Sequence, residues 1–244
     1  MWCSSAATAQ KADTARRPEP LFTWGDAWVA AGVMGATAAL IPFDPKLSDV
    51  FMDLGPHKNS VTFTTSKIFD QLGNPGAVVV SLGTYVVGRI AGQDRLADLG
   101  LHTSEALLLS SVETLLAKGI VGRNRPFLNP SDASNFRFGR GFGSDEHDSF
   151  PSGHTSAAFA AAAAINHETR HWWPHRPLFV GPLLYAGAGL VAVARVYGSQ
   201  HWPSDVIMGA LIGTSAGIKV VRYNHTHPRN RIDRWLGAIA LSPS

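Results

Sequence analysis

The stretch DVIMGALIGTSAGIKVV, residues 205–221, is apolar over most of its length and carries Gly209, Gly213 and Gly217. It lacks the alternation of polar and apolar residues that marks a strand, so it predicts a helix. Glycines at four-residue spacing share one helix face, where they let a second helix backbone approach closely inside a membrane. A glycine-tolerant core helix of a soluble protein has the same pattern. Of the two interpretations, we favour the membrane helix.

Five other stretches have the same apolar character and are long enough for helices: residues 26–42, 76–92, 101–121, 153–166 and 178–194. Each is near or below the roughly 20 residues that span a bilayer. Only 16% of the residues are charged, against roughly 25% in soluble domains, which indicates little water-facing surface. The sequence therefore favours an all-α chain with six transmembrane helices.

The charges suggest an orientation. With both termini in the cytoplasm, twelve of the 21 lysines and arginines fall inside and nine outside, a modest positive-inside bias. Tryptophans near the ends of the proposed spans fit an aromatic belt: Trp24, Trp28, Trp172, Trp173, Trp202 and Trp235. A soluble helical bundle remains the alternative. It would more easily accept Glu105 and Glu113 in the third stretch, and the polar residues that shorten the fourth.

Composition excludes several other classes. The net charge of +3 is too small to indicate a nucleic-acid partner. One cysteine allows no intrachain disulfide and no cysteine-rich zinc site. The start, MWCSSAATAQ, has neither a basic region nor a long apolar region, so it shows no clear signal peptide. We expect an N-terminal tail (1–25), a helical domain (26–221) and a basic C-terminal tail (222–244).

Three short clusters carry candidate chemistry. In KGIVGRNRP, residues 118–126, Lys118 and Arg125 are seven residues apart and can share a helix face, and Pro126 would end that helix. Two cations at a helix end suit an oxyanion such as phosphate, although a basic cluster that anchors to lipid headgroups fits equally well. Residues 126–149 then form a loop long enough to be functional.

The second cluster, FPSGHTS at residues 150–156, opens a helix. Ser152 is a suitable N-cap, and Gly153 permits close backbone approach. The N–H groups of the first turn make an anion site, and His154 would stand beside a bound anion as a proton donor. Taken alone, the same residues also fit a capped helix with an interfacial histidine.

The third cluster is ARVYGSQHWPSD, residues 194–205. Arg195 ends an apolar stretch, and His201 stands just before a helix that Pro203 can begin. Asp205 lies four residues after His201, where its carboxylate can hold one imidazole nitrogen and leave the other free as a nucleophile. The alternative is a local His–Asp cap that serves only the helix.

In this order and spacing, the clusters Lys-x6-Arg-Pro, Pro-Ser-Gly-His and Arg-x5-His-x3-Asp resemble the type-2 phosphatidic acid phosphatase superfamily, which includes class A acid phosphatases and vanadium haloperoxidases. The resemblance covers residues from about 76 to 221. It departs at Ala194, where the family usually has serine, so one hydroxyl contact is lost. It implies a six-helix transmembrane bundle.

The resemblance also implies roles for individual residues. His201 would be the nucleophile that forms a phosphohistidine, Asp205 would orient it, and His154 would protonate the leaving group and later assist water. The phosphoryl oxygens would be bound by Lys118, Arg125, Ser152, Gly153 and Arg195. No cofactor or metal is expected, because three basic side chains neutralise the phosphate. Five other histidines are expected in basic loops, solvated or interfacial rather than ligands: His167, His171, His175, His225 and His227.

The expected substrate is a lipid phosphate or diphosphate, with the site on the outer face of a membrane such as the bacterial inner membrane. Three other functions stay open: a soluble acid phosphatase, a vanadate-dependent haloperoxidase, and a non-catalytic lipid-binding or scaffold protein. The sequence does not choose among lipid phosphates, and it leaves the oligomeric state open.

Overall fold

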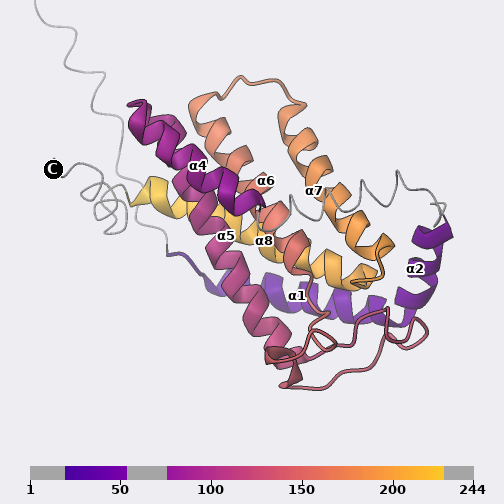
Figure 1. The fold of residues 1–244 in the computed structure, drawn as a ribbon. Helices are drawn as coiled ribbons and strands as arrows, with labels where there is room; N and C mark the ends of the chain where they lie inside the picture. The colour runs from indigo at the N-terminus through magenta and orange to yellow at the C-terminus, as the bar shows by residue number, and fades with distance from the viewer. Residues whose placement is uncertain (1–19, 54–75, 228–244) are drawn as a thin grey trace, which may run out of the picture.

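A computed structural model describes residues 20–53 and 76–227, and these residues form an all-α structure (Figure 1). The predicted tails lie partly outside the described residues, at 1–19 and 228–244. The elements are α1 (Trp24–Leu40), η1 (Ile41–Phe43), α2 (Asp44–Asp53), α4 (Ala77–Ile90), α5 (Asp94–Val121), η3 (Arg140–Phe142), α6 (Gly153–Trp172), α7 (Val180–Tyr197) and α8 (Pro203–Thr226).

Each of the six predicted apolar stretches lies in a helix, so the predicted fold class is confirmed. The helices extend into polar sequence that an apolar pattern cannot mark. Helix α5 begins at Asp94, well before residue 101, and α6 continues through the polar residues after 166 as far as Trp172. Helix α8 runs on to Thr226, past the expected domain end at 221.

The glycines of α8 bring that helix against α6. A Cβ at Gly209 would lie 2.5 Å from the carbonyl oxygen of Ser152, and one at Gly217 would lie 2.6 Å from that of Ala160. Gly213, between them, faces the Ser156 carbonyl even more closely. Side chains other than hydrogen cannot fit at such distances, so the prediction of close helix approach is confirmed.

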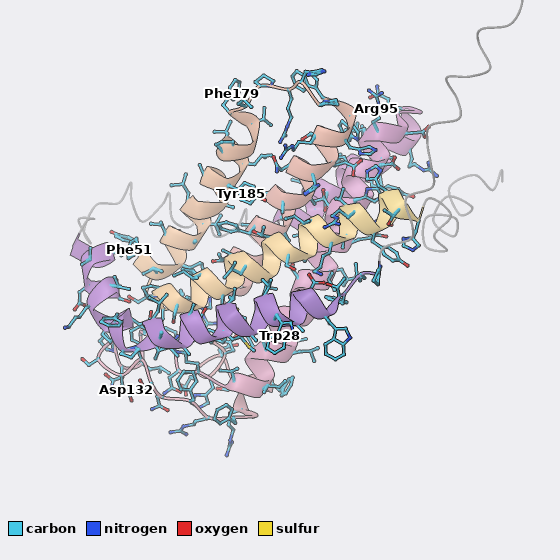
Figure 2. All side chains as sticks on the ribbon, turned by 180° about the vertical axis from the view of Figure 1, so that it is seen from behind. Trp28, Phe51, Arg95, Asp132, Phe179 and Tyr185 are labelled. Atoms are coloured by element: carbon cyan, nitrogen blue, oxygen red, sulfur yellow. The ribbon has the colours of Figure 1, made fainter. Side chains whose placement is uncertain are left out.

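The distribution of polarity is that of a membrane protein. Large apolar side chains are exposed on the outer faces of the helices, as Trp28 and Phe179 illustrate in Figure 2, while the interior holds many alanines and polar groups. Within the part of the chain that the structure describes, three helical segments are long and apolar enough to cross a membrane: 24–51, 180–197 and 203–226. Helix α4 is apolar but shorter, and α5 and α6 do not meet the same criterion. Contact with lipid would remove the free-energy cost of exposing these apolar faces to water.

The end of α5 differs from the prediction. Arg125 does not continue the helix that carries Lys118, and Pro126 does not end it, because α5 stops at Val121. Gly122 adopts a left-handed conformation with φ 60° and donates its N–H to the Lys118 carbonyl. A Cβ at Gly122 would strike the Arg137 carbonyl oxygen, so this turn requires glycine.

We expect Gly213→Ala to destabilise the protein, because the added methyl group meets the α6 backbone. Overpacking of this kind costs about 1–3 kcal/mol. Gly187→Ala on α7 is the matched control, since a Cβ there meets nothing within 4 Å. Thermal unfolding in detergent compares the two variants. Equal melting temperatures would show that the α6–α8 interface can relax.

Candidate phosphate-binding site

The amino-terminal ends of α6 and α8 lie side by side. The backbone N–H of Ser152 donates to the carbonyl oxygen of Asp205 at 3.0 Å. Ser152 caps α6, with its hydroxyl accepting from the Thr155 N–H, and Pro203 is the first residue of α8, both as predicted. Two of the three sequence clusters therefore meet at one end of the bundle.

His201 is the buried imidazole at this junction, with 1% of its surface exposed. Its Nδ1 lies 2.7 Å from the carbonyl oxygen of Ser149, which can only accept, so Nδ1 carries the proton. In the neutral ring Nε2 then keeps its lone pair. Burial, with Lys118 and Arg195 adding to the effect, lowers the pKa of His201 to about 3. The ring is therefore neutral near pH 7.

Asp205 does not hold His201 as the sequence suggested. Its Oδ2 is 3.8 Å from the imidazole Nδ1, too far for a hydrogen bond. The same oxygen instead accepts from the Ser149 hydroxyl at 2.6 Å and from the Trp202 N–H at 2.9 Å. Asp205 thus fixes the backbone on both sides of the imidazole, and the Ser149 carbonyl makes the direct contact.

Arg123 is a fully buried cation behind this arrangement. Its Nη1 donates to Asp205 Oδ1 at 2.5 Å, and its Nη2 donates to Asp44 Oδ2 at 2.7 Å. The guanidinium also lies over the ring of Trp202, 5.4 Å from the centroid. Trp202 is itself fully buried, so the prediction that it belongs to an interfacial belt is wrong.

Lys118 and Arg125 meet at a shared carboxylate, although they are not on one helix. Lys118 Nζ lies 3.5 Å from Asp148 Oδ2 and also donates to the Asp148 carbonyl. Arg125 Nε donates to Asp148 Oδ1 at 2.8 Å. Arg125 Nη1 reaches Gln200 Oε1 at 3.0 Å, one residue before His201. The first and third clusters are therefore joined.

The remaining predicted residues lie at the same end. A Cβ at Gly153 would be 3.7 Å from Lys118 Cε, which places the start of α6 beside that lysine. His154 is the next residue in the first turn of α6 and is partly exposed. Arg195 is buried in the last turn of α7, and its carbonyl oxygen accepts from the His201 N–H at 3.3 Å.

Sequence reasoning missed Arg123, Asp44 and Ser149. Arg123 stands within the first cluster, but its spacing to Lys118 gives no reason to single it out. Asp44 is 79 residues away from it along the chain, and only the folded contact reveals the pair. Ser149 acts through its backbone carbonyl and its hydroxyl, and spacing marks neither of these contacts.

The expectation that the other histidines lie in solvated loops is wrong for three of them. His167 and His171 lie in α6, and His225 lies in the last turn of α8. The imidazole of His225 forms a hydrogen bond with the buried carboxylate of Glu168. Glu168, near the end of α6, is one of the polar residues that end the fourth apolar stretch, together with Asn166 and His167.

The PAP2 superfamily matches residues 99–229, which is more than half of the chain and includes all three clusters. The chain belongs to the PAP2 superfamily.

Two curated relatives share part of this region. The chain is 34% identical over 70 residues to a protein named lipid A 1-phosphatase from Porphyromonas gingivalis, covering 29% of this chain and 15% of that protein. It is 32% identical over 90 residues to an undecaprenyl-diphosphatase from Sulfolobus acidocaldarius, covering 37% of this chain and 40% of that protein. The chain thus spans less than half the length of either relative.

A solved structure shares the fold. A transmembrane PAP2-type phosphatidylglycerolphosphate phosphatase from Bacillus subtilis superposes with a TM-score of 0.65 at 18% identity. The match covers 86% of this chain and 100% of that one. With the three candidate spans, this fold supports an integral membrane protein.

We expect Arg123→Ala to lower the free energy of unfolding by about 3–5 kcal/mol, because Asp44 and Asp205 would be left buried without their cation. Arg123→Lys keeps the charge but loses the bidentate geometry of the guanidinium, so its free energy of unfolding should lie between those of Arg123→Ala and the wild type. Arg137→Ala, on a half-exposed loop residue, is the control. Thermal unfolding in detergent measures all three. A melting temperature unchanged in Arg123→Ala would contradict this role.

Proposed function

We propose that this protein is a membrane phosphatase that hydrolyses a lipid phosphate monoester or diphosphate through a phosphohistidine on His201. The observation that carries the proposal is the state of this imidazole. Its Nδ1–H is held by the Ser149 carbonyl and its pKa is low, so Nε2 has a lone pair for attack near neutral pH. Lys118 and Arg195 act electrostatically on His201, and Arg125 contacts the neighbouring Gln200, which supports assigning these three cations to the phosphoryl group it attacks.

The reaction has two steps. In the first, His201 Nε2 forms a bond to phosphorus while the bond to the leaving oxygen breaks, and His154 donates a proton to that oxygen. In the second, His154 takes a proton from water, the water oxygen attacks phosphorus, and the P–N bond breaks to release inorganic phosphate. His154 stands in the first turn of α6, where the helix N-terminus favours the same anion.

The cations would replace a metal in this scheme. The transferred phosphoryl group spreads negative charge over its equatorial oxygens, which fixed donors stabilise. Lys118 and Arg125 supply two such groups, Arg195 a third, and the N–H groups after Ser152 add neutral donors. Asp205 acts indirectly by positioning Ser149 and the Trp202 backbone.

A lipid substrate fits the surroundings of the site. The loop between α5 and α6 carries exposed apolar side chains, among them Phe127, Phe138 and Phe142. Aromatic side chains favour the boundary between lipid and water. Basic residues such as Arg95 and Arg222 gather at the other end of the bundle, near the end of α4, the start of α5 and the end of α8. This supports an orientation with the site facing the periplasm or exterior.

Asp148 lies between Lys118 and Arg125, the two cations that we propose bind the phosphate. An incoming phosphate must displace this carboxylate, so we expect Asp148→Asn to bind inorganic phosphate several-fold more tightly. Inhibition of phosphate ester hydrolysis by inorganic phosphate measures the affinity. Asp145→Asn is the control, because Arg125 contacts only the backbone carbonyl of Asp145. Weaker binding in Asp148→Asn would mean that the carboxylate holds the cations in place for substrate.

The proposed function is tested by phosphate release from a panel of lipid and water-soluble monoesters and diphosphates, assayed in EDTA. We expect release from lipid substrates to persist in EDTA. His201→Ala should reduce it by about a thousandfold or more while the protein stays folded. His175→Ala, in an exposed loop, is the matched control. Preference for water-soluble esters would favour an acid phosphatase, and a requirement for Mg²⁺ or full activity in His201→Ala would contradict the mechanism.

A further inference from the structure

A second group of histidines lies far from the phosphate-binding site. His102 of α5 and His225 of α8 both contact the carboxylate of Glu168 on α6. Glu168 and His154 are fourteen residues apart on the same helix, or about 21 Å at the α-helical rise. In Figure 2, Arg95 lies toward the end of the bundle with this group, and Asp132 lies in the loop at the end with the phosphate site. The group therefore belongs to a different part of the molecule.

The three side chains present ligand atoms at a spacing that suits a metal ion. His102 Nδ1 and His225 Nε2 are each 3.0 Å from Glu168 Oε2, and the three atoms lie within 4.8 Å of one another. Zinc binds nitrogen and oxygen at about 2.0–2.2 Å, so tetrahedral ligands stand about 3.4 Å apart. Small rotations of these side chains would bring all three atoms onto one ion.

Neighbouring side chains fix the orientation of two of the three ligands, Glu168 and His225. Trp172 Nε1 donates to Glu168 Oε1 at 2.9 Å, and His225 Nε2 lies 3.1 Å from that oxygen and 3.0 Å from Oε2. The Trp172 bond fixes the orientation of the carboxylate between the two imidazoles. The ring of His171 packs against that of His225, with centroids 3.8 Å apart. Such outer contacts are typical of metal sites, where they fix the direction of each ligand.

One side of the group is open. A pocket of about 300 Å³ is lined by His102, His225 and Asp98, together with Tyr85 and Arg89. Glu168 is almost fully buried, whereas the His225 side chain is 27% exposed. An ion can therefore enter from the pocket, and water can supply a fourth ligand. Asp98 would also add negative charge opposite a divalent cation.

We propose that His102, Glu168 and His225 bind a divalent transition-metal ion of the Zn²⁺ type. Two imidazoles and one carboxylate bind Zn²⁺ and Co²⁺ well. Hard ions such as Mg²⁺ prefer sites made of oxygen ligands alone. Each ligand comes from a different helix, so the ion ties α5, α6 and α8 together at the end remote from the phosphate site. It takes no part in the phosphoryl transfer proposed above.

The test uses the full chain without a histidine tag, purified in detergent, stripped with EDTA and dialysed. Co²⁺ is then titrated and followed by its visible absorption, with Zn²⁺ added in competition. We expect one Co²⁺ per chain, displaced by Zn²⁺, and a higher melting temperature with Zn²⁺. These readouts are independent of phosphatase activity.

Variants separate a true site from incidental binding. His225→Asn should weaken Co²⁺ binding by at least about tenfold, and so should Glu168→Gln, which keeps the size of the side chain. His227→Asn, two residues further along the chain, should bind as the wild type does. Circular dichroism of each metal-free variant checks that it is folded. Absence of stoichiometric Co²⁺ absorption in the wild type, or equal affinity in His225→Asn and wild type, would overturn the proposal and leave the group as a hydrogen-bonded cross-link.

Discussion

The close packing of α6 against α8 is the constraint on which the site depends. Gly209, Gly213 and Gly217 present no side chain of their own to α6, so the two backbones approach closely at these positions. At the end of this contact the Ser152 N–H reaches the Asp205 carbonyl. That bond sets the position of two helix N-termini, one followed by His154 and the other preceded by His201. A wider helix separation would move the two imidazoles apart, whatever their own conformations.

The second constraint is electrostatic. A membrane interior offers no water to solvate charge, so buried ions must find partners within the protein. Arg123 meets this need for two carboxylates at once, Asp44 from the amino-terminal segment and Asp205 from α8. Asp205 in turn accepts a hydrogen bond from the Ser149 hydroxyl. The backbone carbonyl of Ser149 accepts from His201. The orientation of the imidazole thus depends on a series of hydrogen bonds that runs from the buried Arg123 through Asp205 and Ser149.

The helices, and the residues that begin α6 and α8, could be predicted because they leave local marks. Glycine spacing, an N-cap serine and a proline at the start of a helix depend on neighbours within one or two turns. Long-range contacts leave no such mark. The contact between Arg123 and Asp44 and the contact between Ser149 and His201 arise only when distant segments meet. The end of α5 was misjudged for a different reason, since Gly122 can either continue a helix or end it and the sequence favoured Pro126.

The two ends of α6 illustrate how one helix can serve opposite charges. At its amino end, the N–H groups of the first turn and the helix dipole favour an anion, which suits a phosphate beside His154. Near its carboxyl end the dipole opposes a negative charge, yet Glu168 is buried there. A carboxylate in that position needs a positive charge close by. His102 and His225 can supply this charge, either as protonated imidazoles or as ligands of a bound metal ion. A polar residue that ended a predicted apolar stretch is therefore the one at which three helices meet.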